Sequence, residues 1–426
     1  MKINNNLFRF GWLVVINLSI VSFLSDFVYE GSRSILGQYF LLLNIPVFYL
    51  ALVSGFSEFI GYSIRYFIGY FIDKFKESKF LIIYIGYFLN LISVPLLYFA
   101  NNFYFVFTLV FLERFGKGLR IPPRDSVFYL VSKKSNIDSN KIFGIHHLMD
   151  QLGAFIGPLF LSFIFYYFNF KDIYHYKLAF LILGIPIFLV FLHLFLANYY
   201  FNKINQNNIN DLQNDDLQND ALENLLENKN NKNNNSKNID NYFAFLYIFS
   251  MIIAFGYIDF PIILYYFKSF FNIDYLGVIL YSLAMISSAF GGFISSSLFK
   301  KYSDLTIIFC LLLIFVYPIL LFFIKNVVVF VLASLFWGWA LGSLETIFKI
   351  LVSLKTLDEN IGKNFGLFHT LFGLTWFIGS LFLGFIYQKL GFHLMFLFSS
   401  FIQLLSLIFF ILFKNKILFH QKNINP

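Results

Sequence analysis

The sequence predicts an all-α membrane protein whose twelve transmembrane helices form two six-helix halves. The first reason is composition, because 59% of the 426 residues are hydrophobic and only 13% are charged. The second is that the apolar residues form runs of about 20, each long enough to cross a hydrocarbon core of roughly 30 Å. The third is that short motifs of the first half recur in the second half at a constant offset.

The expected spans follow the apolar runs in chain order. They cover residues 10–42, 47–72, 79–99, 103–131, 141–168, 177–198, 242–267, 274–299, 304–324, 327–354, 363–388 and 391–413. An asparagine-rich segment separates the sixth span from the seventh, and such weakly hydrophobic compositions do not bury enough apolar surface to fold. We therefore expect an N-terminal bundle over 1–198, a disordered or loosely helical linker over 199–241 and a C-terminal bundle over 242–426.

The two halves share sequence as well as length. The motif Lys-x-Phe-Gly-x-x-His at residues 141–147 recurs at 363–369, and the segment 155–161 recurs in similar form at 377–383. Both pairs have an offset of 222 residues without a gap. A constant offset of this kind indicates a duplicated six-helix unit.

Basic residues near the span ends set the expected orientation. With the N-terminus inside, nineteen lysine and arginine residues fall on the inner side and five on the outer side. The positive-inside rule then places both termini and the linker in the cytoplasm. We expect a multi-pass protein of the plasma or inner membrane, in contact with the lipid bilayer and monomeric.

Composition also excludes several classes of protein. A single cysteine, Cys310, rules out an internal disulfide and a cysteine metal cluster. The net charge of +8 reflects the basic bias of one membrane face, so we expect no nucleic-acid partner. No motif indicates a metal or a cofactor, and we expect the chain not to be an enzyme.

The fourth span is unusual because it carries charges within an apolar run. A charge at the centre of a bilayer costs roughly 2.5–3.5 kcal/mol unless it is compensated. On a helix, 113, 117, 120 and 124 share one face, which would point into a polar cavity. Pro122 and Pro123 are expected to kink or break this helix. The charged residues are Glu113, Arg114, Lys117, Arg120, Arg124 and Asp125.

Other spans also carry polar residues that need partners. In the first span, Arg33 lies three residues after Glu30, within salt-bridge reach on one helix. In the second half, Glu345 and Lys349 form a pair four residues apart. The remaining candidates are Asp26 and Tyr29 in the first span, Glu58 and Arg65 in the second, and His146 and Asp150 in the fifth. The second half also offers Asp259 and His369, with an aromatic wall of Tyr257, Trp337, Trp339 and Trp376.

The loop after the second span carries a family motif. It contains Gly69, Asp73 and Lys74 and resembles the Gly-x-x-x-Asp-Arg/Lys loop of the major facilitator superfamily, although Lys76 replaces the second glycine. The resemblance covers essentially the whole chain. It implies two pseudo-symmetric bundles and a cytoplasmic gate, to which we also assign Arg124 and Asp125.

Two further motifs resemble this superfamily. Arg114-x-x-Lys117-Gly118 is similar to its Arg-x-x-Gln-Gly motif, whose arginine is associated with substrate or proton handling. The segment from Gly116 to Asp125 resembles a branch of transporters that are mostly unassigned. Gly153, Gly157 and Pro158 resemble the antiporter motif, and plain helix packing is the alternative explanation for the two glycines.

We therefore expect a secondary active transporter that works by alternating access and exports a small organic solute in exchange for protons. The expected proton carriers are Asp26, Glu30, Glu113 and Asp150, with His146 behind them. The expected substrate cavity comprises Tyr29, Arg33, Glu58, Arg65, Arg114, Lys117, Arg120, Glu345 and Lys349. Uptake of an organic anion is the alternative within this class. A receptor, or a membrane-embedded enzyme that uses His146 and Asp150 as acid and base, are alternatives of another class.

Overall fold

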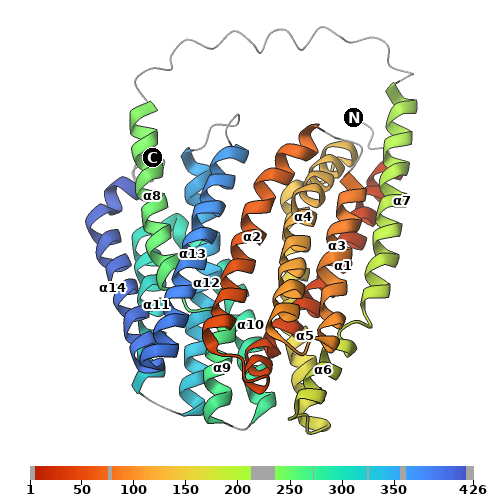
Figure 1. Ribbon diagram of the computed structural model, residues 1–426. Helices are drawn as coiled ribbons and strands as arrows, with labels where there is room; N and C mark the ends of the chain where they lie inside the picture. Colours follow the sequence, from red (N-terminus) through yellow and green to blue (C-terminus); the bar gives the residue numbers. More distant parts are fainter. Residues whose placement is uncertain are drawn as a thin grey trace.

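A computed structural model describes residues 5–74, 79–212, 236–271, 273–323, 326–355 and 361–418, and these ranges contain helices and no strand. The helices form two groups that stand side by side (Figure 1). The first comprises α1 (Asn5–Leu42), α2 (Val47–Lys74), α3 (Lys79–Leu96) with a 3-10 turn (Leu97–Phe99), α4 (Phe103–Ser135), α5 (Ser139–Tyr167), α6 (Ile173–Ile182) and α7 (Ile187–Leu212). The second comprises α8 (Ser236–Gly256), α9 (Phe260–Phe270), α10 (Asp274–Lys301), α11 (Ser303–Phe323), α12 (Val327–Lys355), α13 (Ile361–Leu390) and α14 (Phe392–Ile417). The all-α prediction is confirmed.

Among the described residues, eleven helical segments are long and apolar enough to cross a membrane. The expected fourth span corresponds to α4, which has 33 residues and is as long as its neighbours. It falls outside the eleven because its charged residues lower its hydropathy. The exposed rings and aliphatic side chains over the outer surface agree with a protein surrounded by lipid.

Two expected spans are each interrupted, which the sequence analysis did not predict. The sixth span divides into α6 and α7 at residues 183–186, where Gly184 and Ile185 make hydrogen bonds to the carbonyls three residues earlier. Pro186 has no N–H group to continue the helical pattern. The seventh span divides into α8 and α9 at 257–259, because Asp259 takes the N-cap position and Pro261 the first turn of α9.

For α4, in contrast, the sequence analysis predicted a break that the helix does not have. Pro122 and Pro123 lie inside it without ending it, so of the expected kink or break the break is wrong, and the kink stays a prediction. The helix is supported by α3, which packs against it closely at Gly86 and Gly116. Asn90 of α3 also donates a hydrogen bond of 2.9 Å to the carbonyl of Glu113. Such support from neighbouring helices is what allows prolines inside membrane helices.

The start of α1 and the end of α14 lie at the same end of the molecule, and we call this the linker end and the opposite one the far end (Figure 1). The helix α7 continues to Leu212 and α8 begins at Ser236, so helix extends into both sides of the expected linker 199–241. Its centre lies outside the described residues.

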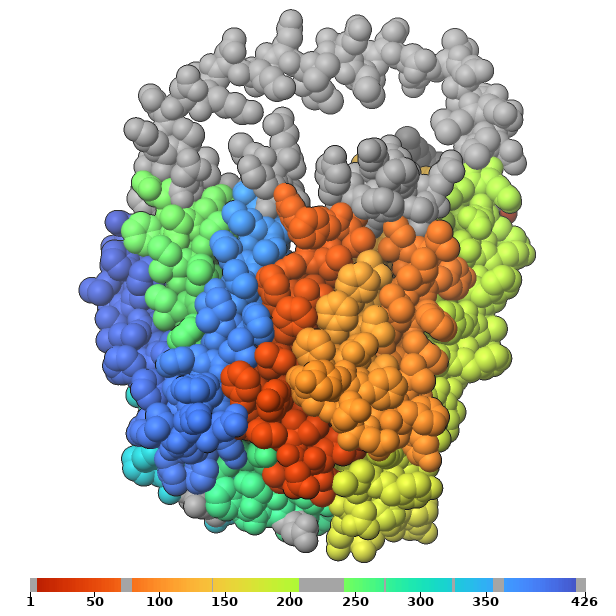
Figure 2. Space-filling view, in the orientation of Figure 1, coloured from red at the N-terminus to blue at the C-terminus, as the bar shows by residue number. Residues whose placement is uncertain are grey.

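The two groups meet directly along α2 and α13. On the face shown in Figure 2, α13 lies against α2 over most of its length. Glycines of α13 make this approach possible, because a methyl group in their place would press on the facing side chain of α2. The facing pairs are Gly366–Tyr66, Gly373–Tyr62 and Gly384–Ala51.

Polar contacts join the two groups at the far end. Gln38 of α1 donates to the backbone carbonyl of Asp274 at 3.2 Å. The hydroxyl group of Tyr176 on α6 lies 3.0 Å from the Asp274 carboxylate and 2.9 Å from the Gln38 side-chain oxygen. Lys268 of α9 pairs with the same carboxylate. These four residues form the far-end lock, which holds α1 and α6 against α9 and α10.

Candidate transport site

Helices α1 and α4 face each other along a polar seam. They run in opposite directions, so each step of three or four residues down α1 matches a similar step up α4. The facing pairs, from the middle to the linker end, are Tyr29 with Arg114 and Lys117, Asp26 with Arg120, and Ser22 with Arg124. We call this set the α1–α4 seam.

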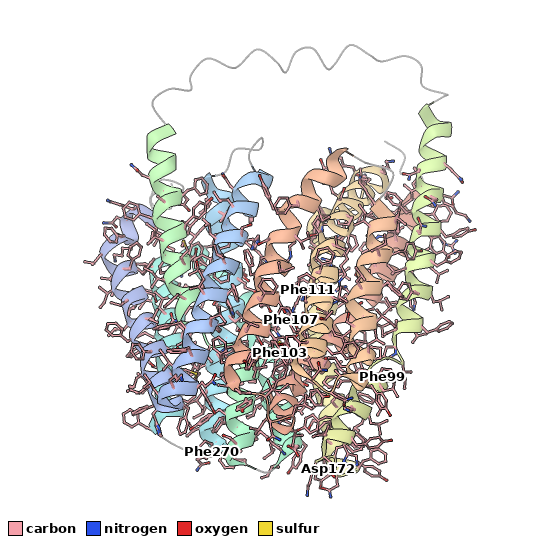
Figure 3. The ribbon with its side chains drawn as sticks, viewed as in Figure 1. Phe99, Phe103, Phe107, Phe111, Asp172 and Phe270 are labelled. Carbon is pink, nitrogen blue, oxygen red and sulfur yellow. The ribbon has the colours of Figure 1, made fainter. Side chains whose placement is uncertain are left out.

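The character of α4 changes where the seam begins. Its far-end half presents Phe103, Phe107 and Phe111, which follow one another toward the middle of the molecule in Figure 3. Phe107 and Phe111 stack on Phe56 of α2, with ring centroids 5.7 and 6.0 Å apart. The charged residues start at Glu113, so the polar part of α4 extends from mid-helix to the linker end.

Glu58 of α2 holds the middle of the site. Its Oε1 atom lies 2.6 Å from Arg33 and 3.2 Å from Arg114, so one carboxylate pairs with two guanidinium groups. Arg114 also lies 3.6 Å from Glu113. The expected ion pair between Arg33 and Glu30 within α1 is therefore replaced by one between helices, since a guanidinium reaches a facing carboxylate as easily as one on its own helix.

Glu30 is held by hydroxyl groups from both halves. Tyr29 donates to one carboxylate oxygen, and Tyr281 of α10 donates to the other. Lys117 contacts the Tyr29 hydroxyl, so the chain of contacts continues to α4. Tyr281 is a site residue that the sequence analysis missed, because no charge or motif distinguishes it from the other tyrosines.

Nearer the linker end, the seam pairs residues of opposite sign. Arg120 lies 3.4 Å from Asp26, and its guanidinium carbon lies 4.2 Å from the centroid of the Tyr87 ring. Only 1% of Arg120 is exposed, and its Nε and Nη1 atoms have no hydrogen-bond partner. Removing one member of a buried ion pair costs about 3–5 kcal/mol, so Asp26 and Arg120 depend on each other.

His146 and Asp150 lie together on α5, as expected from their spacing. The distance from Nε2 of His146 to the Asp150 carboxylate is 3.5 Å. His146 is buried, and neither of its ring nitrogens makes a hydrogen bond. The Oδ1 atom of Asp150 is likewise buried without a partner.

The residues expected at the cytoplasmic gate lie on two helices. Arg124 and Asp125 belong to α4, and Gly69, Asp73 and Lys74 belong to α2. Arg124 pairs with its neighbour Asp125 at 3.0 Å and lies 3.4 Å from the Ser22 hydroxyl. Gly69 lies on α2 with open space around it. Asp73 and Lys74 belong to the last turn of α2, and their side chains lie outside the described residues. A latch formed by this loop therefore stays a prediction.

Packing accounts for the glycines of the antiporter-like motif. A methyl group at Gly153 would overlap the carbonyl of Phe23, and one at Gly157 would overlap that of Phe27. The two glycines therefore let α5 approach the backbone of α1, while Pro158 lies inside α5 without ending it. This close approach fixes α1 beside α5 as well as beside α4.

In the second half, the break between α8 and α9 has its own polar support. The Tyr317 hydroxyl oxygen accepts a hydrogen bond of 3.2 Å from the Ile258 N–H. Trp337 donates to the Ile258 carbonyl at 2.8 Å. Asp259 accepts hydrogen bonds of 2.9 Å from Trp376 and 2.8 Å from Ser380, both on α13. The break is therefore a defined structure within the bundle.

Asp259 is the acidic group at the centre of the second half, and it is 1% exposed. Of the expected aromatic wall, Tyr257 packs against Trp337 and Trp376, with ring centroids 5.5 and 5.1 Å apart. The sequence signal for this arrangement was Asp259 two residues before Pro261, which is typical of a helix start.

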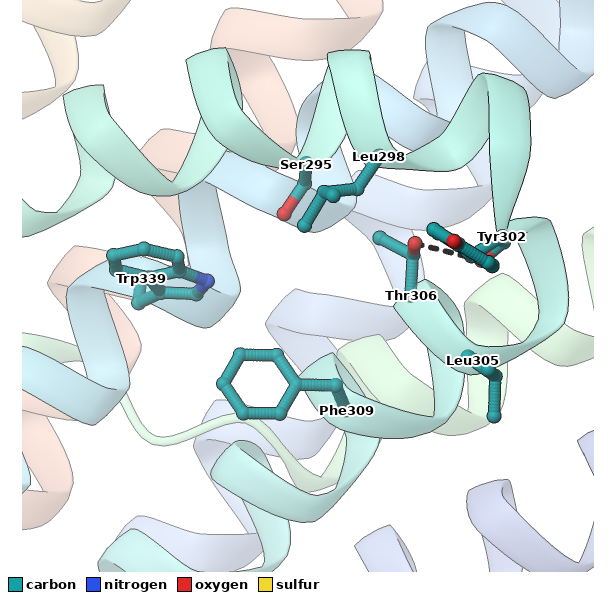
Figure 4. A pocket seen from close by; sticks show the side chains of 7 residues that line it. All are labelled: Ser295, Leu298, Tyr302, Leu305, Thr306, Phe309 and Trp339. Atoms are coloured by element: carbon teal, nitrogen blue, oxygen red, sulfur yellow. Dashed lines mark hydrogen bonds between the residues drawn. The ribbon is translucent and has the colours of Figure 1, made fainter.

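Two expectations for α12 are corrected. Glu345 and Lys349 are both exposed, and within the described part of the chain no ion pair joins them. Trp339 does not join the aromatic wall. It lies instead beside a shallow groove between α10, α11 and α12, which is lined by Ser295, Leu298, Tyr302, Leu305, Thr306, Phe309 and Trp339 (Figure 4). This groove is mainly apolar and separate from the seam.

The fold and the seam together define a polytopic helical membrane protein with a charged seam inside its first half, which Tyr281 of the second half contacts at Glu30. Residues 18–348 match the model of the Major Facilitator Superfamily, and the chain belongs to this superfamily. Its family and its fold are those that the resemblance implied.

Sequence relatives match over a limited stretch. A protein of Mycobacterium tuberculosis, described as uncharacterized, is 33% identical over 149 residues, which is 35% of this chain and 36% of the relative. A transporter of the same superfamily from Methanocaldococcus jannaschii, also uncharacterized, is 29% identical over 156 residues, or 36% of this chain and 38% of the relative. The match thus spans little more than a third of these relatives.

Solved structures match over almost the whole chain. A POT family transporter in complex with 5-aminolevulinic acid has a TM-score of 0.74 at 15% identity, covering 95% of this chain and 96% of that one. The nucleoside transporter NupG has a TM-score of 0.69 at 15% identity, covering 94% of this chain and 99% of that one. At such identities these similarities show the fold alone.

Proposed function

We propose that this secondary transporter exchanges protons for a small organic solute, and that acids of the α1–α4 seam and of α5 carry the protons. The observation that carries the proposal is the seam together with the adjoining Glu113: Asp26 is buried beside Arg120, and Glu113 is buried beside Arg114, inside a membrane protein. A purely structural role is a poor explanation for these charges, because buried ion pairs rarely stabilise a fold more than apolar side chains would.

The supporting detail is that several acids have incomplete partners. Oε1 of Glu113 and Oδ1 of Asp150 are buried without a hydrogen bond, and Asp26 has one long contact to Arg120. A carboxylate that gains or loses water or a cation changes its affinity for a proton. Movement of α1 against α4 would change these contacts, and this would couple proton binding to the shape of the site.

Contacts between the halves support alternating access as the mechanism. Tyr281 joins α10 to Glu30 in the middle, and the far-end lock closes the opposite end from the linker. We further propose that the linker end faces the cytoplasm, as the distribution of basic residues indicates. Opening the far end would then require that the lock and the contact between Tyr281 and Glu30 both break.

The direction of transport is tested with the purified protein in liposomes, using a panel of labelled metabolites under an imposed pH gradient. Exchange predicts that a transported solute accumulates in the more acidic compartment, because it moves against the proton flow. Accumulation in the more alkaline compartment would support the alternative, uptake with protons. Equal distribution under every gradient, for solutes that do cross, would contradict proton coupling.

A further inference from the structure

A basic cluster lies between the two halves, outside the α1–α4 seam. The rings of Tyr62 on α2 and His369 on α13 are stacked, with centroids 5.4 Å apart and planes 3° from parallel. The guanidinium carbon of Arg65 lies 5.0 Å from the centroid of Tyr62. Lys349 of α12 follows Phe348, whose ring centroid lies 5.5 Å from that of Phe368, the residue before His369. We call Tyr62, Arg65, Lys349 and His369 the basic vestibule.

The cations of the vestibule have no carboxylate of their own. Among the described residues, neither Arg65 nor Lys349 lies within ion-pair distance of an acid. Nε of Arg65 and Nδ1 of His369 are buried atoms that make no hydrogen bond. Lys349 is exposed, but Arg65 is partly buried, and an unpaired cation inside a membrane protein is costly and marks a functional site more often than a structural one.

The nearby acids do not neutralise this cluster. Glu58 lies four residues before Tyr62 on α2, and Glu345 lies four residues before Lys349 on α12. Glu58 is already shared by Arg33 and Arg114, at 2.6 and 3.2 Å. Glu345 is exposed, and its single negative charge is fewer than the two positive charges of Arg65 and Lys349. Counted over the residues that the structure describes, the vestibule therefore has an excess of positive charge.

We infer that the basic vestibule binds small organic anions and that the solute of the proposed transport is of this class. A carboxylate, sulfonate or phosphate ester supplies the acceptor oxygens that Arg65 and His369 lack, and a guanidinium suits such groups well. Arg65 belongs to the first half, and Lys349 and His369 belong to the second. An anion bound among them ties the halves together, so binding changes the balance between the two states of the transporter.

The test measures the charge of the vestibule with a small organic anion as the probe. Ser353 of α12 is exposed and lies one helical turn beyond Lys349. In a Cys310→Ser background, Ser353→Cys provides a single thiol at this point. Its reaction rate is measured with an anionic methanethiosulfonate reagent, the sulfonatoethyl derivative, and with the cationic trimethylammonium-ethyl derivative. Gln388→Cys on α13, which is exposed at the far end, is the control position.

The inference predicts that the ratio of anionic to cationic reaction rates is at least about threefold higher at position 353 than at position 388, since clefts of one charge concentrate ions of the other. Arg65→Gln and Lys349→Gln should lower the ratio at 353 toward that of the control, and Arg65→Lys should retain most of it. Equal ratios at the two positions, or a ratio unaffected by these substitutions, would overturn the inference. If the inference fails in this way but proton-coupled flux is still measured, the proposed function holds.

Discussion

The hydroxyl group of Tyr281 on α10 donates a hydrogen bond to Glu30 on α1 and thereby joins the two halves at the middle of the charged site. Glu30 is also contacted by Tyr29, whose hydroxyl lies beside Lys117. The state of the seam in the first half is thus connected to a side chain of the second half. This contact gives the first prediction.

Tyr281→Phe should slow transport without unfolding the protein. The change removes a hydrogen bond to a charged group, which typically contributes about 1.5–3 kcal/mol, so the balance between states should shift roughly tenfold or more. The measurement is solute flux in liposomes beside thermal unfolding. Tyr242→Phe is the matched control, because its hydroxyl bonds to Leu351 within the second half. Equal flux in Tyr281→Phe and the parent protein would show that the contact has no role in transport.

Glu58→Gln should destabilise the fold. It would leave Arg33 and Arg114 without the carboxylate they share, at a cost of about 3–5 kcal/mol. Thermal unfolding of the purified protein measures this as a lower midpoint. The double variant Arg33→Gln, Glu58→Gln should recover part of the loss, because it no longer contains Arg33 as an unpaired cation. The remaining cation, Arg114, keeps Glu113 as a partner. A double variant no more stable than Glu58→Gln alone would argue against this pairing.

The far-end lock predicts an effect on accessibility. In a Cys310→Ser background, a thiol at Ser162→Cys should react slowly with a membrane-impermeant maleimide, since Ser162 is buried against the Tyr275 carbonyl of the other half. Adding Gln38→Ala removes two contacts of the lock, worth about 1 kcal/mol each, and should raise the rate roughly thirtyfold. An unchanged rate would mean that other contacts close this end.

The hydrogen bond from Trp337 to the break between α8 and α9 predicts that its removal lowers the stability of the protein. Trp337→Phe leaves the Ile258 carbonyl without its donor and should cost about 1–3 kcal/mol, read as a lower thermal midpoint. Trp12→Phe is the matched control, because the Trp12 ring packs edge-on against Phe8 on α1. Similar losses in the two variants would show that ring volume, rather than the hydrogen bond, supports the break.

The sequence was sufficient for the fold because span length and composition are set by the bilayer. It also identified the charged residues of α4, since charges inside apolar runs need an explanation whatever the tertiary structure. It did not identify their partners. The contact of Arg33 with Glu58 joins two helices, whereas helical spacing compares positions within one helix.

The second half was harder to predict for a related reason. Asp259 has neutral partners, Trp376 and Ser380, and such hydrogen bonds leave no charge pattern in the sequence. Tyr281 acts through a hydroxyl group, and tyrosine is common in this chain. The helix break did have a local signal in Pro261, and Pro186 gave a similar one after Gly184.

The most direct test of proton coupling through the seam compares two kinds of flux in Asp26→Asn, Glu113→Gln and Asp150→Asn. Each variant is reconstituted in liposomes with an identified solute, and Asp304→Asn, whose native carboxylate pairs with Lys414 at the surface, is the control. Our account predicts that at least one of these three variants loses accumulation driven by a pH gradient but retains exchange of labelled for unlabelled solute. If all three retain gradient-driven accumulation at the level of the control, neither the acids at the seam nor Asp150 carries the protons.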